Sequence, residues 1–172
     1  MKNKIYDCFM FNNEIDLLNI RLNVLNEYVD YFVIIESLET HSGLRKKTQF
    51  IKEKFQEFEH KIIYGVIPKF PNDLSPWEKE NYQRNYIEKF LNKADENDLI
   101  LISDLDEIPN LKNLNLFCIK EKVIIFQQRL FFYKLNFGEL IPSWHGTRCI
   151  KKKNLKSPQW LRNLKTHKKY KF

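Results

Sequence analysis

The run Leu99–Ile102 constrains the fold of this chain more than any other stretch. Its sequence, LILI, is a short apolar run bounded by polar residues, which is typical of a strand buried on both faces. Three carboxylates follow it, Asp104, Asp106 and Glu107, and Pro109 ends the segment. The carboxyl ends of the strands line the ligand crevice of an open α/β sheet, so an apolar strand followed by an acidic loop indicates a site.

The pair Asp104 and Asp106 favours a metal ion. In an extended segment, residues two apart place their side chains on one face, where like charges cost free energy unless a cation or a basic side chain compensates them. Two other interpretations stay open: a solvated turn that caps the following helix, and a phosphatase-like aspartate nucleophile, which needs more chain downstream. An EF-hand calcium loop fits poorly, because Ile108 is fifth from Asp104 and no glycine is sixth.

The length of 172 residues fits one domain with a single sizeable core. No apolar run approaches the roughly 18 residues of a spanning helix, and the N-terminus lacks the pattern of a signal peptide. The three cysteines, Cys8, Cys118 and Cys149, fit neither a disulfide framework nor a zinc cluster. We therefore expect a cytoplasmic protein in a reducing compartment.

Basic residues are concentrated at the C-terminal end. The formal net charge is +7, but residues 151–172 hold nine of the 29 lysines and arginines and no acid, which leaves 20 basic and 22 acidic residues in 1–150. We therefore predict a domain over 1–150 and a basic C-terminal tail over 151–172. Such a tail is usually solvated, and it also suits peripheral attachment to an anionic membrane surface. Nucleic acid is not an expected partner.

The first half of the chain alternates strands and helices, as a doubly wound sheet does. Strands are predicted at Lys4–Met10, Tyr31–Ile35, Lys61–Ile67 and Leu99–Ile102, and helices at Asn13–Val29, Lys46–Glu59 and Pro76–Ala94. The last of these helices has the most secure start, since Ser75 and Glu78 form a capping box and Pro76 takes the first helical position.

The second half does not alternate in this way. It contains a predicted short helix at Leu111–Cys118, one long or two short strands within Val123–Tyr133, and a strand or site loop at Trp144–Ile150. The sequence leaves the order of the strands in the sheet open.

Several of these segments together resemble glycosyltransferase family 17, the family of the β-1,4-mannosyl-glycoprotein N-acetylglucosaminyltransferases. The matching blocks are Tyr6–Ser37 with Thr40 and Gly43 just after it, Glu80–Ile87, Asp98–Pro109, Gln127–Asn136 and Trp144–Cys149. One acidic motif is a weak signal, whereas five blocks in the family's order form a specific one. The resemblance implies a GT-A-like, Rossmann-like single domain, with a mixed, mostly parallel central sheet and helices on both faces.

The same resemblance implies a UDP-sugar donor, a glycan acceptor, and an Asp-x-Asp motif that holds Mn²⁺ or Mg²⁺ against the donor diphosphate. We expect Asp106 to be the direct ligand and Asp104 to coordinate through water or to hold the ribose. Glu107 is expected to orient the loop or a basic neighbour. The expected function is metal-dependent transfer of a sugar, with N-acetylglucosamine as the expected one, to a glycan.

Three residues outside the acidic loop are further candidates for donor binding. Arg84 is expected to point its guanidinium at uracil or phosphate, with a surface ion pair to Glu80 or Glu88 as the alternative. Glu36, which follows the second predicted strand, is a candidate acceptor for a ribose or base hydrogen bond. Phe9 is a candidate to pack on the base, although a core position is the more usual place for such a side chain.

Trp144, His145 and Arg148 are candidates for a wall that contacts the acceptor or the donor, because sugar rings stack on aromatic faces. The sequence does not identify the general base that inverting transfer requires. Members of the family usually continue well beyond the last matching block. Two alternative functions therefore remain: a truncated, inactive GT-A domain that binds nucleotide or a partner, and an anion-binding or membrane-binding module that acts through the basic tail.

Overall fold

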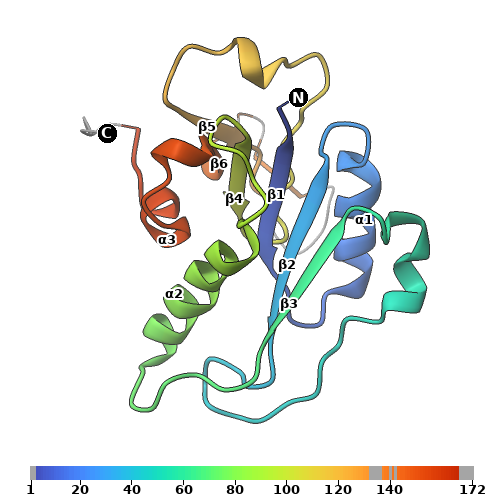
Figure 1. Cartoon of the computed structure of the whole chain (residues 1–172), viewed down its shortest axis with the longest axis vertical. Helices are drawn as coiled ribbons and strands as arrows, with labels where there is room; N and C mark the ends of the chain where they lie inside the picture. The colour runs from blue at the N-terminus through green and yellow to red at the C-terminus, as the bar shows by residue number, and fades with distance from the viewer. Residues whose placement is uncertain (1–2, 132–136, 140, 142, 167–172) are drawn as a thin grey trace.

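The structure, a computed structural model, describes residues 3–131, 137–139, 141 and 143–166. Its centre is a six-stranded sheet of order β3-β2-β1-β4-β6-β5 (Figure 1). The strands are β1 (Ile5–Met10), β2 (Tyr31–Ser37), β3 (Ile62–Ile67), β4 (Leu99–Ser103), β5 (Val123–Gln128) and β6 (Trp144–Lys151). Strands β1 to β4 pair in parallel, and β6 runs antiparallel to both β4 and β5. The prediction of an α/β fold with a mixed, mostly parallel sheet is confirmed.

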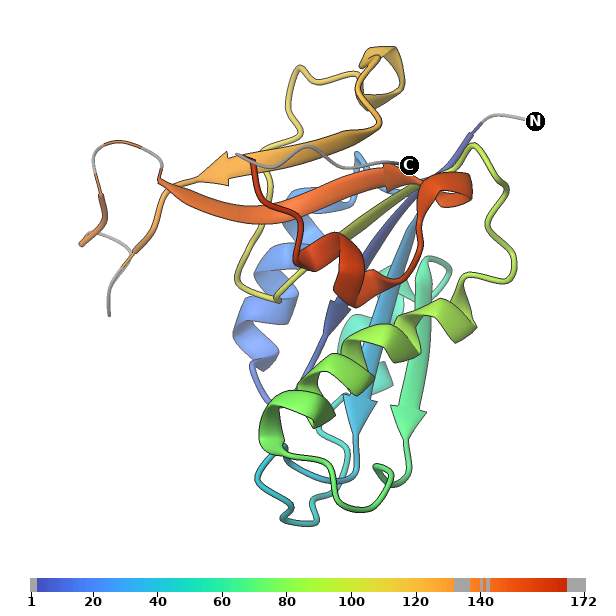
Figure 2. The same ribbon diagram turned by 90° about the vertical axis from the view of Figure 1, so that its left-hand side faces the viewer.

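Helical segments cover both faces of the sheet. They are α1 (Ile15–Leu25), η1 (Lys52–Phe58), α2 (Pro76–Tyr86), η2 (Ile87–Phe90), η3 (Leu116–Cys118), η4 (Lys152–Asn154) and α3 (Pro158–Arg162). Figures 1 and 2 show α1 on one face and α2 with α3 on the other. Each face has its own buried cluster: Leu18 and Leu22 of α1 belong to one, and Ile87 and Leu161 belong to the other. In the part of the chain that the structure describes, no helix combines the length and the apolar character needed to span a bilayer.

The predicted strand Leu99–Ile102 lies in β4, and all five residues of β4 are buried. Its neighbours explain this burial, because β4 lies between β1 and β6 and both faces of the sheet are covered. The predicted start of α2 is also confirmed. Ser75 Oγ accepts from Glu78 N, and Glu78 Oε2 accepts from Ser75 N at 2.9 Å. Each side chain thus accepts the backbone N–H of the other residue, which has no acceptor within the helix.

The predicted helix at Lys46–Glu59 is wrong. Only Lys52–Phe58 forms 3-10 turns, and Phe55 interrupts them with φ −126° and ψ 30°. The reason lies in the preceding segment, where the backbone N–H groups of Gln49 and Phe50 donate to the buried Glu36 carboxylate, at 2.7 Å and 3.1 Å. These contacts hold the chain in a non-helical path across the end of β2.

Other helices begin or end at residues different from those predicted. Glu14, not Asn13, precedes the first residue of α1, and its Oε2 accepts from the backbone N–H groups of Asn12 and Asn13. This helix ends at Leu25 instead of Val29. Helix α2 ends at Tyr86 and passes into η2, while only Leu116–Cys118 of the predicted helix after Pro109 is helical. Strand β5 ends at Gln128, and residues 132–136 lie outside the described residues.

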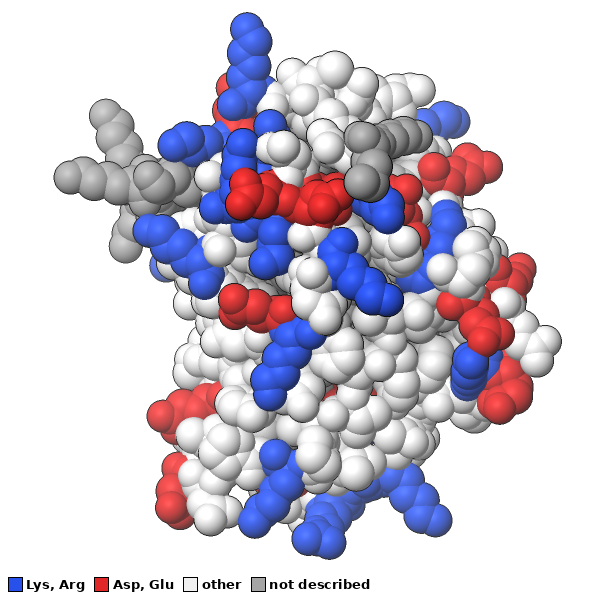
Figure 3. All heavy atoms as spheres, in the orientation of Figure 1, with Lys and Arg blue, Asp and Glu red and all other residues white. Residues whose placement is uncertain are grey.

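The basic C-terminal segment is not a separate tail over its described part. Lys151 closes β6, and α3 follows with Ser157 Oγ accepting from Trp160 N at 3.1 Å. Leu161 and Leu164 are buried against the sheet. The predicted division at residues 150 and 151 therefore falls inside the packed fold, and residues 167–172 lie outside the described ones. Figure 3 shows acidic and basic side chains interspersed on the face that it displays.

Candidate functional site

A cavity of about 460 Å³ opens beyond the carboxyl ends of β1, β2 and β4. It is lined by Met10, Phe11, Asn12, Glu14, Leu17, Ser37, Glu39, Thr40, His41, Lys46, Glu80, Gln83, Asp104, Leu105 and Asp106. The cavity lies where the sequence placed a ligand crevice, because parallel strands bring their carboxyl ends to one edge of the sheet. Of the predicted site residues, it brings together Asp104 and Asp106.

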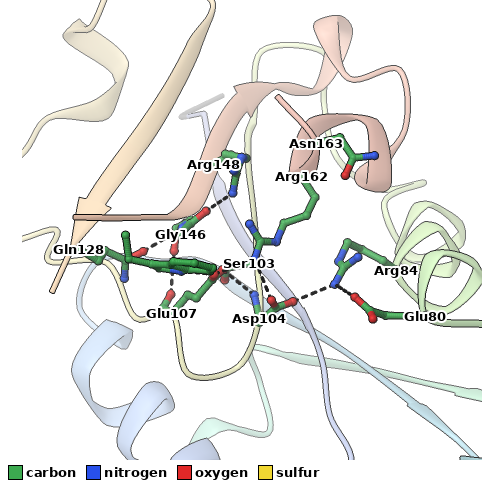
Figure 4. Close-up of polar contacts among 12 residues, drawn as sticks. Glu80, Arg84, Ser103, Asp104, Glu107, Gln128, Gly146, Arg148, Arg162 and Asn163 are labelled. Atoms are coloured by element: carbon green, nitrogen blue, oxygen red, sulfur yellow. Dashed lines mark hydrogen bonds and ion pairs between the residues drawn. The ribbon is translucent and has the colours of Figure 1, made fainter. Parts of the chain in front are cut away.

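Two arginines from the helices on one face converge on Asp104 (Figure 4). Arg84 of α2 lies 2.9 Å from Oδ1, and Arg162 of α3 lies 2.9 Å from Oδ2. Burial alone would raise the pKa of this carboxyl, but the two guanidinium groups outweigh it and lower the pKa below its ordinary value. Asp104 is therefore ionised and fixed in place.

Glu107 fixes the other side of the acidic loop, as expected. Its Oε2 accepts from the backbone N–H of Asp104 at 2.9 Å, and its Oε1 accepts from Trp144 Nε1 at 2.6 Å and from Arg162 at 2.8 Å. Burial is the main cause that raises the pKa of Glu107, the charge of Asp104 adds to it, and Arg162 opposes it. The loop is thus tied to β6 and to α3.

A buried ion pair beneath the loop was missed by the sequence analysis. Arg21 of α1 donates to both carboxylate oxygens of Asp7 in β1, at 2.7 Å and 2.8 Å, and both side chains are fully buried. Its Nη1 also donates to the backbone carbonyls of Asp104 and Leu105, each at 2.9 Å, and of Glu107 at 3.3 Å. A signal existed, since Arg21 stands among the apolar residues that mark the buried stripe of α1.

Phe9 and Glu36 do not have the predicted donor-binding geometry. Phe9 is fully buried, and the Arg21 guanidinium lies over its ring, 4.5 Å from the centroid. Glu36 is also fully buried, and its carboxylate accepts from Lys46 Nζ at 2.7 Å, from Tyr64 Oη at 2.8 Å and from two backbone N–H groups. Both assignments are corrected: Phe9 is a core residue, and Glu36 anchors the segment after β2.

Arg84 and Arg148 are also placed differently from the predictions. Arg84 is buried and holds Glu80, Asp104 and Gln159 instead of lining the cavity, so its pair with Glu80 is not a surface ion pair. Arg148 is buried as well and donates to the backbone carbonyls of Leu164 and Gly146. Burial, with the positive charge of Arg162 adding to it, lowers the pKa of Arg148 to about 10.

Trp144 and His145 are exposed at the start of β6 and do not line the cavity. They are consecutive residues of a strand, so their side chains point to opposite faces. The indole N–H of Trp144 is held by Glu107, while 42% of the residue stays exposed. Trp144 thus keeps a free surface next to the acidic loop, and it is the member of the predicted wall with the most suitable position.

The carboxylate oxygens at the cavity suit a hard divalent cation, provided that a bound substrate supplies further ligands to the ion. Within the described residues, no group of three or more His, Cys, Asp or Glu side chains is placed to hold a metal ion alone. Mg²⁺, however, is usually bound by one or two carboxylates together with substrate phosphates. Asp106 is exposed and lines the cavity with Asp104, so its carboxylate is the more accessible ligand.

Comparisons with known proteins agree with the family that the sequence resembles. The family model of glycosyltransferase family 17 matches residues 1–160. Proteins from rat, human and mouse, each named β-1,4-mannosyl-glycoprotein 4-β-N-acetylglucosaminyltransferase, are 28% identical to this chain over an alignment of 116 residues. The match covers 62% of this chain. The matched region is 22% of each of these relatives, so the chain spans only about a fifth of their length.

Proposed function

The chain belongs to glycosyltransferase family 17, and we propose that it transfers N-acetylglucosamine from a UDP-sugar to a glycan acceptor with the help of Mn²⁺ or Mg²⁺. One observation carries the proposal: two carboxylates at the end of a buried parallel strand, Asp104 and Asp106, open on a cavity of about 460 Å³. The names of the relatives supply the sugar, since each is called an N-acetylglucosaminyltransferase. The volume lies within the range of small-molecule sites.

In this proposal the two aspartates have different tasks. Asp106, exposed on the cavity, would be the direct ligand of the metal ion, and the remaining ligands would come from the donor diphosphate and water. A bound divalent cation would neutralise the charge that develops on the leaving diphosphate. Asp104 is held ionised by Arg84 and Arg162 and would keep the loop that carries Asp106 in position, with a contact to the metal ion through water.

The acceptor is proposed to approach over Trp144, whose exposed indole lies beside Glu107. Sugar rings stack on aromatic faces, and the hydrogen bond to Glu107 fixes the orientation of the indole before a ligand binds. His145 stays a prediction, but its side chain lies on the opposite face of β6 from Trp144. Arg148 is no longer part of the surface at Trp144, because its guanidinium is buried.

The donor site is tested by calorimetric titration of the chain with UDP, with and without Mn²⁺. We expect saturable binding that requires the metal, and a loss of about tenfold or more in Asp106→Ala, because a direct ligand is removed. Asp95→Ala is the matched control: it removes an exposed aspartate before β4, at the opposite end of that strand. A folded chain that binds no UDP under either condition would refute the proposal.

Turnover is a separate measurement. Transfer from UDP-N-acetylglucosamine to a glycan acceptor supports an enzyme, whereas metal-dependent UDP binding without transfer would leave an inactive donor-binding domain. Binding to anionic vesicles that survives Asp106→Ala and falls steeply with salt would instead favour the module that acts through basic residues.

A further inference from the structure

The described lining of the cavity includes one imidazole, that of His41, and the donor site proposed above does not use it. We propose that His41 is the general base of the transfer and takes the proton of the acceptor hydroxyl at Nδ1, and that Gln83 is a positioning residue that holds the required tautomer. This inference rests on the proposed function, since it needs a donor in the same cavity.

The turn that carries His41 is closely tied together. Thr40 N donates to the carbonyl of Leu44 at 2.8 Å, and Leu44 N donates to Thr40 Oγ1 at 2.9 Å. Gly43 takes a φ of +93°, in the region that favours glycine. The His41 ring lies 6.0 Å from the Phe70 ring, centroid to centroid. The imidazole is therefore held at the cavity by a defined turn and an aromatic neighbour.

The chemistry of Gln83 decides which nitrogen of His41 carries the proton. Gln83 Nε2 donates to the backbone carbonyl of Ile35 in β2, at 2.9 Å, and a carbonyl oxygen can only accept. The other end of the amide, Oε1, therefore faces His41 Nε2 at 2.8 Å and must accept its proton. A neutral imidazole has only one N–H group, so Nδ1 keeps its lone pair and is free to act as a base.

The other titratable groups that line the cavity are less suited to this role. Glu39 is paired with Lys79 at 2.5 Å, and this contact lowers the pKa of its carboxyl. Glu80 is paired with Arg84 at 2.8 Å. Asp104 has an arginine on each oxygen.

Three groups remain in the lining. Asp106 is assigned to the metal, Glu14 accepts from two backbone N–H groups, and the Lys46 ammonium pairs with Glu36. Among the titratable groups of the described lining, His41 offers an imidazole nitrogen whose partner nitrogen is held by a neutral amide.

In the proposed step the acceptor oxygen attacks the anomeric carbon on the face opposite the diphosphate. A new carbon–oxygen bond forms as the bond from that carbon to the diphosphate oxygen breaks, and the leaving UDP keeps the electron pair. The hydroxyl proton moves to His41 Nδ1, which leaves an imidazolium with both nitrogens protonated. Water then removes this proton from the imidazolium.

The test compares His41→Ala with His60→Ala, which removes an exposed histidine from the turn before β3. UDP binding with Mn²⁺ and the rate of transfer are measured for both. We expect His41→Ala to bind UDP as the unaltered chain does and to lose about 10²–10⁴-fold in transfer, and we expect added imidazole to restore part of the rate. His60→Ala should match the unaltered chain in both measurements.

Gln83→Leu provides the second variant. It removes the acceptor for the His41 Nε2–H without touching the ring, so kcat should fall while the KM values for donor and acceptor stay unchanged. Transfer by His41→Ala within about threefold of the unaltered chain would overturn the inference. A parallel loss of UDP binding and transfer, without rescue by imidazole, would also overturn it, since His41 would then only shape the donor site. Failure of the unaltered chain to bind UDP would refute the proposed function itself.

Discussion

Replacing Arg21 by methionine should destabilise the fold strongly and distort the acidic loop. Arg21 makes two hydrogen bonds to Asp7, one to Ser103 Oγ, and three to backbone carbonyls of the segment from Asp104 to Glu107. In Arg21→Met the Asp7 carboxylate stays fully buried without its partner. Removing one member of a buried ion pair costs about 3–5 kcal/mol, because the other charge is left uncompensated. That is a large part of the 5–15 kcal/mol that typically stabilises a domain.

Urea unfolding followed by circular dichroism measures this cost, and a double-mutant cycle separates the charge from the packing. Asp7→Asn combined with Arg21→Met removes both charges, so the double variant should lose less free energy of unfolding than the two single variants together. Arg129→Met removes an exposed arginine and should change the free energy of unfolding by no more than about 0.5 kcal/mol.

The same variant also tests the link to the site. Because Arg21 holds carbonyls of the loop that carries Asp104 and Asp106, UDP binding by Arg21→Met should be weaker even where the variant is fully folded. If Arg21→Met unfolds within about 1 kcal/mol of the unaltered chain, or if the two single effects add without coupling, the reasoning from the buried ion pair is refuted.

Three further predictions are simpler. Ser75→Ala should cost about 1 kcal/mol of unfolding free energy, because it removes half of the capping box; an unchanged urea midpoint would contradict this. Gly146→Ala should cost about 1–3 kcal/mol in the same assay, because its Cβ would displace the Gln128 amide and leave the Thr147 N–H without its acceptor. Ionised Asp104 stabilises the fold above the ordinary carboxyl pKa, and this stabilisation is lost as pH falls through its lowered pKa. The Tm advantage over Asp104→Asn should therefore shrink below about pH 4, and an advantage independent of pH would argue against the ion pairs.

The parallel half of the fold was predictable because its signals are local. Each of the four parallel strands is a short, mainly apolar run, and most residues of β1, β2 and β4 are buried. The start of α2 was predictable for a similar reason, since the capping box lies within four residues of sequence. The position of the cavity then follows from the parallel order, which brings the ends of β1, β2 and β4 to one edge.

The failures come from side chains whose partners lie far away in sequence. The apolar spacing of residues 46–59 suits a helix, but the carboxylate of Glu36 takes up the backbone donors of Gln49 and Phe50. Arg162 reaches Asp104 across 58 residues of sequence, from a segment that its charge alone marked as a tail. A local signal for α3 was nevertheless present, since Ser157 and Pro158 repeat the cap pattern of Ser75 and Pro76.

The two arginines beside Asp104 distinguish it from Asp106. Two carboxylates on one face need a cation or a basic side chain to compensate them, and their spacing in the sequence does not distinguish between the two residues. In the structure, basic side chains compensate Asp104, whereas no donor among the described residues pairs with the exposed Asp106 carboxylate. Only the Asp106 carboxylate is therefore left for a metal ion to compensate, and Asp104 fixes α2 and α3 to the loop. This division supports the proposal that Asp106 is the direct ligand. The proposed donor site would then depend on α3, a helix that sequence reasoning had left outside the domain.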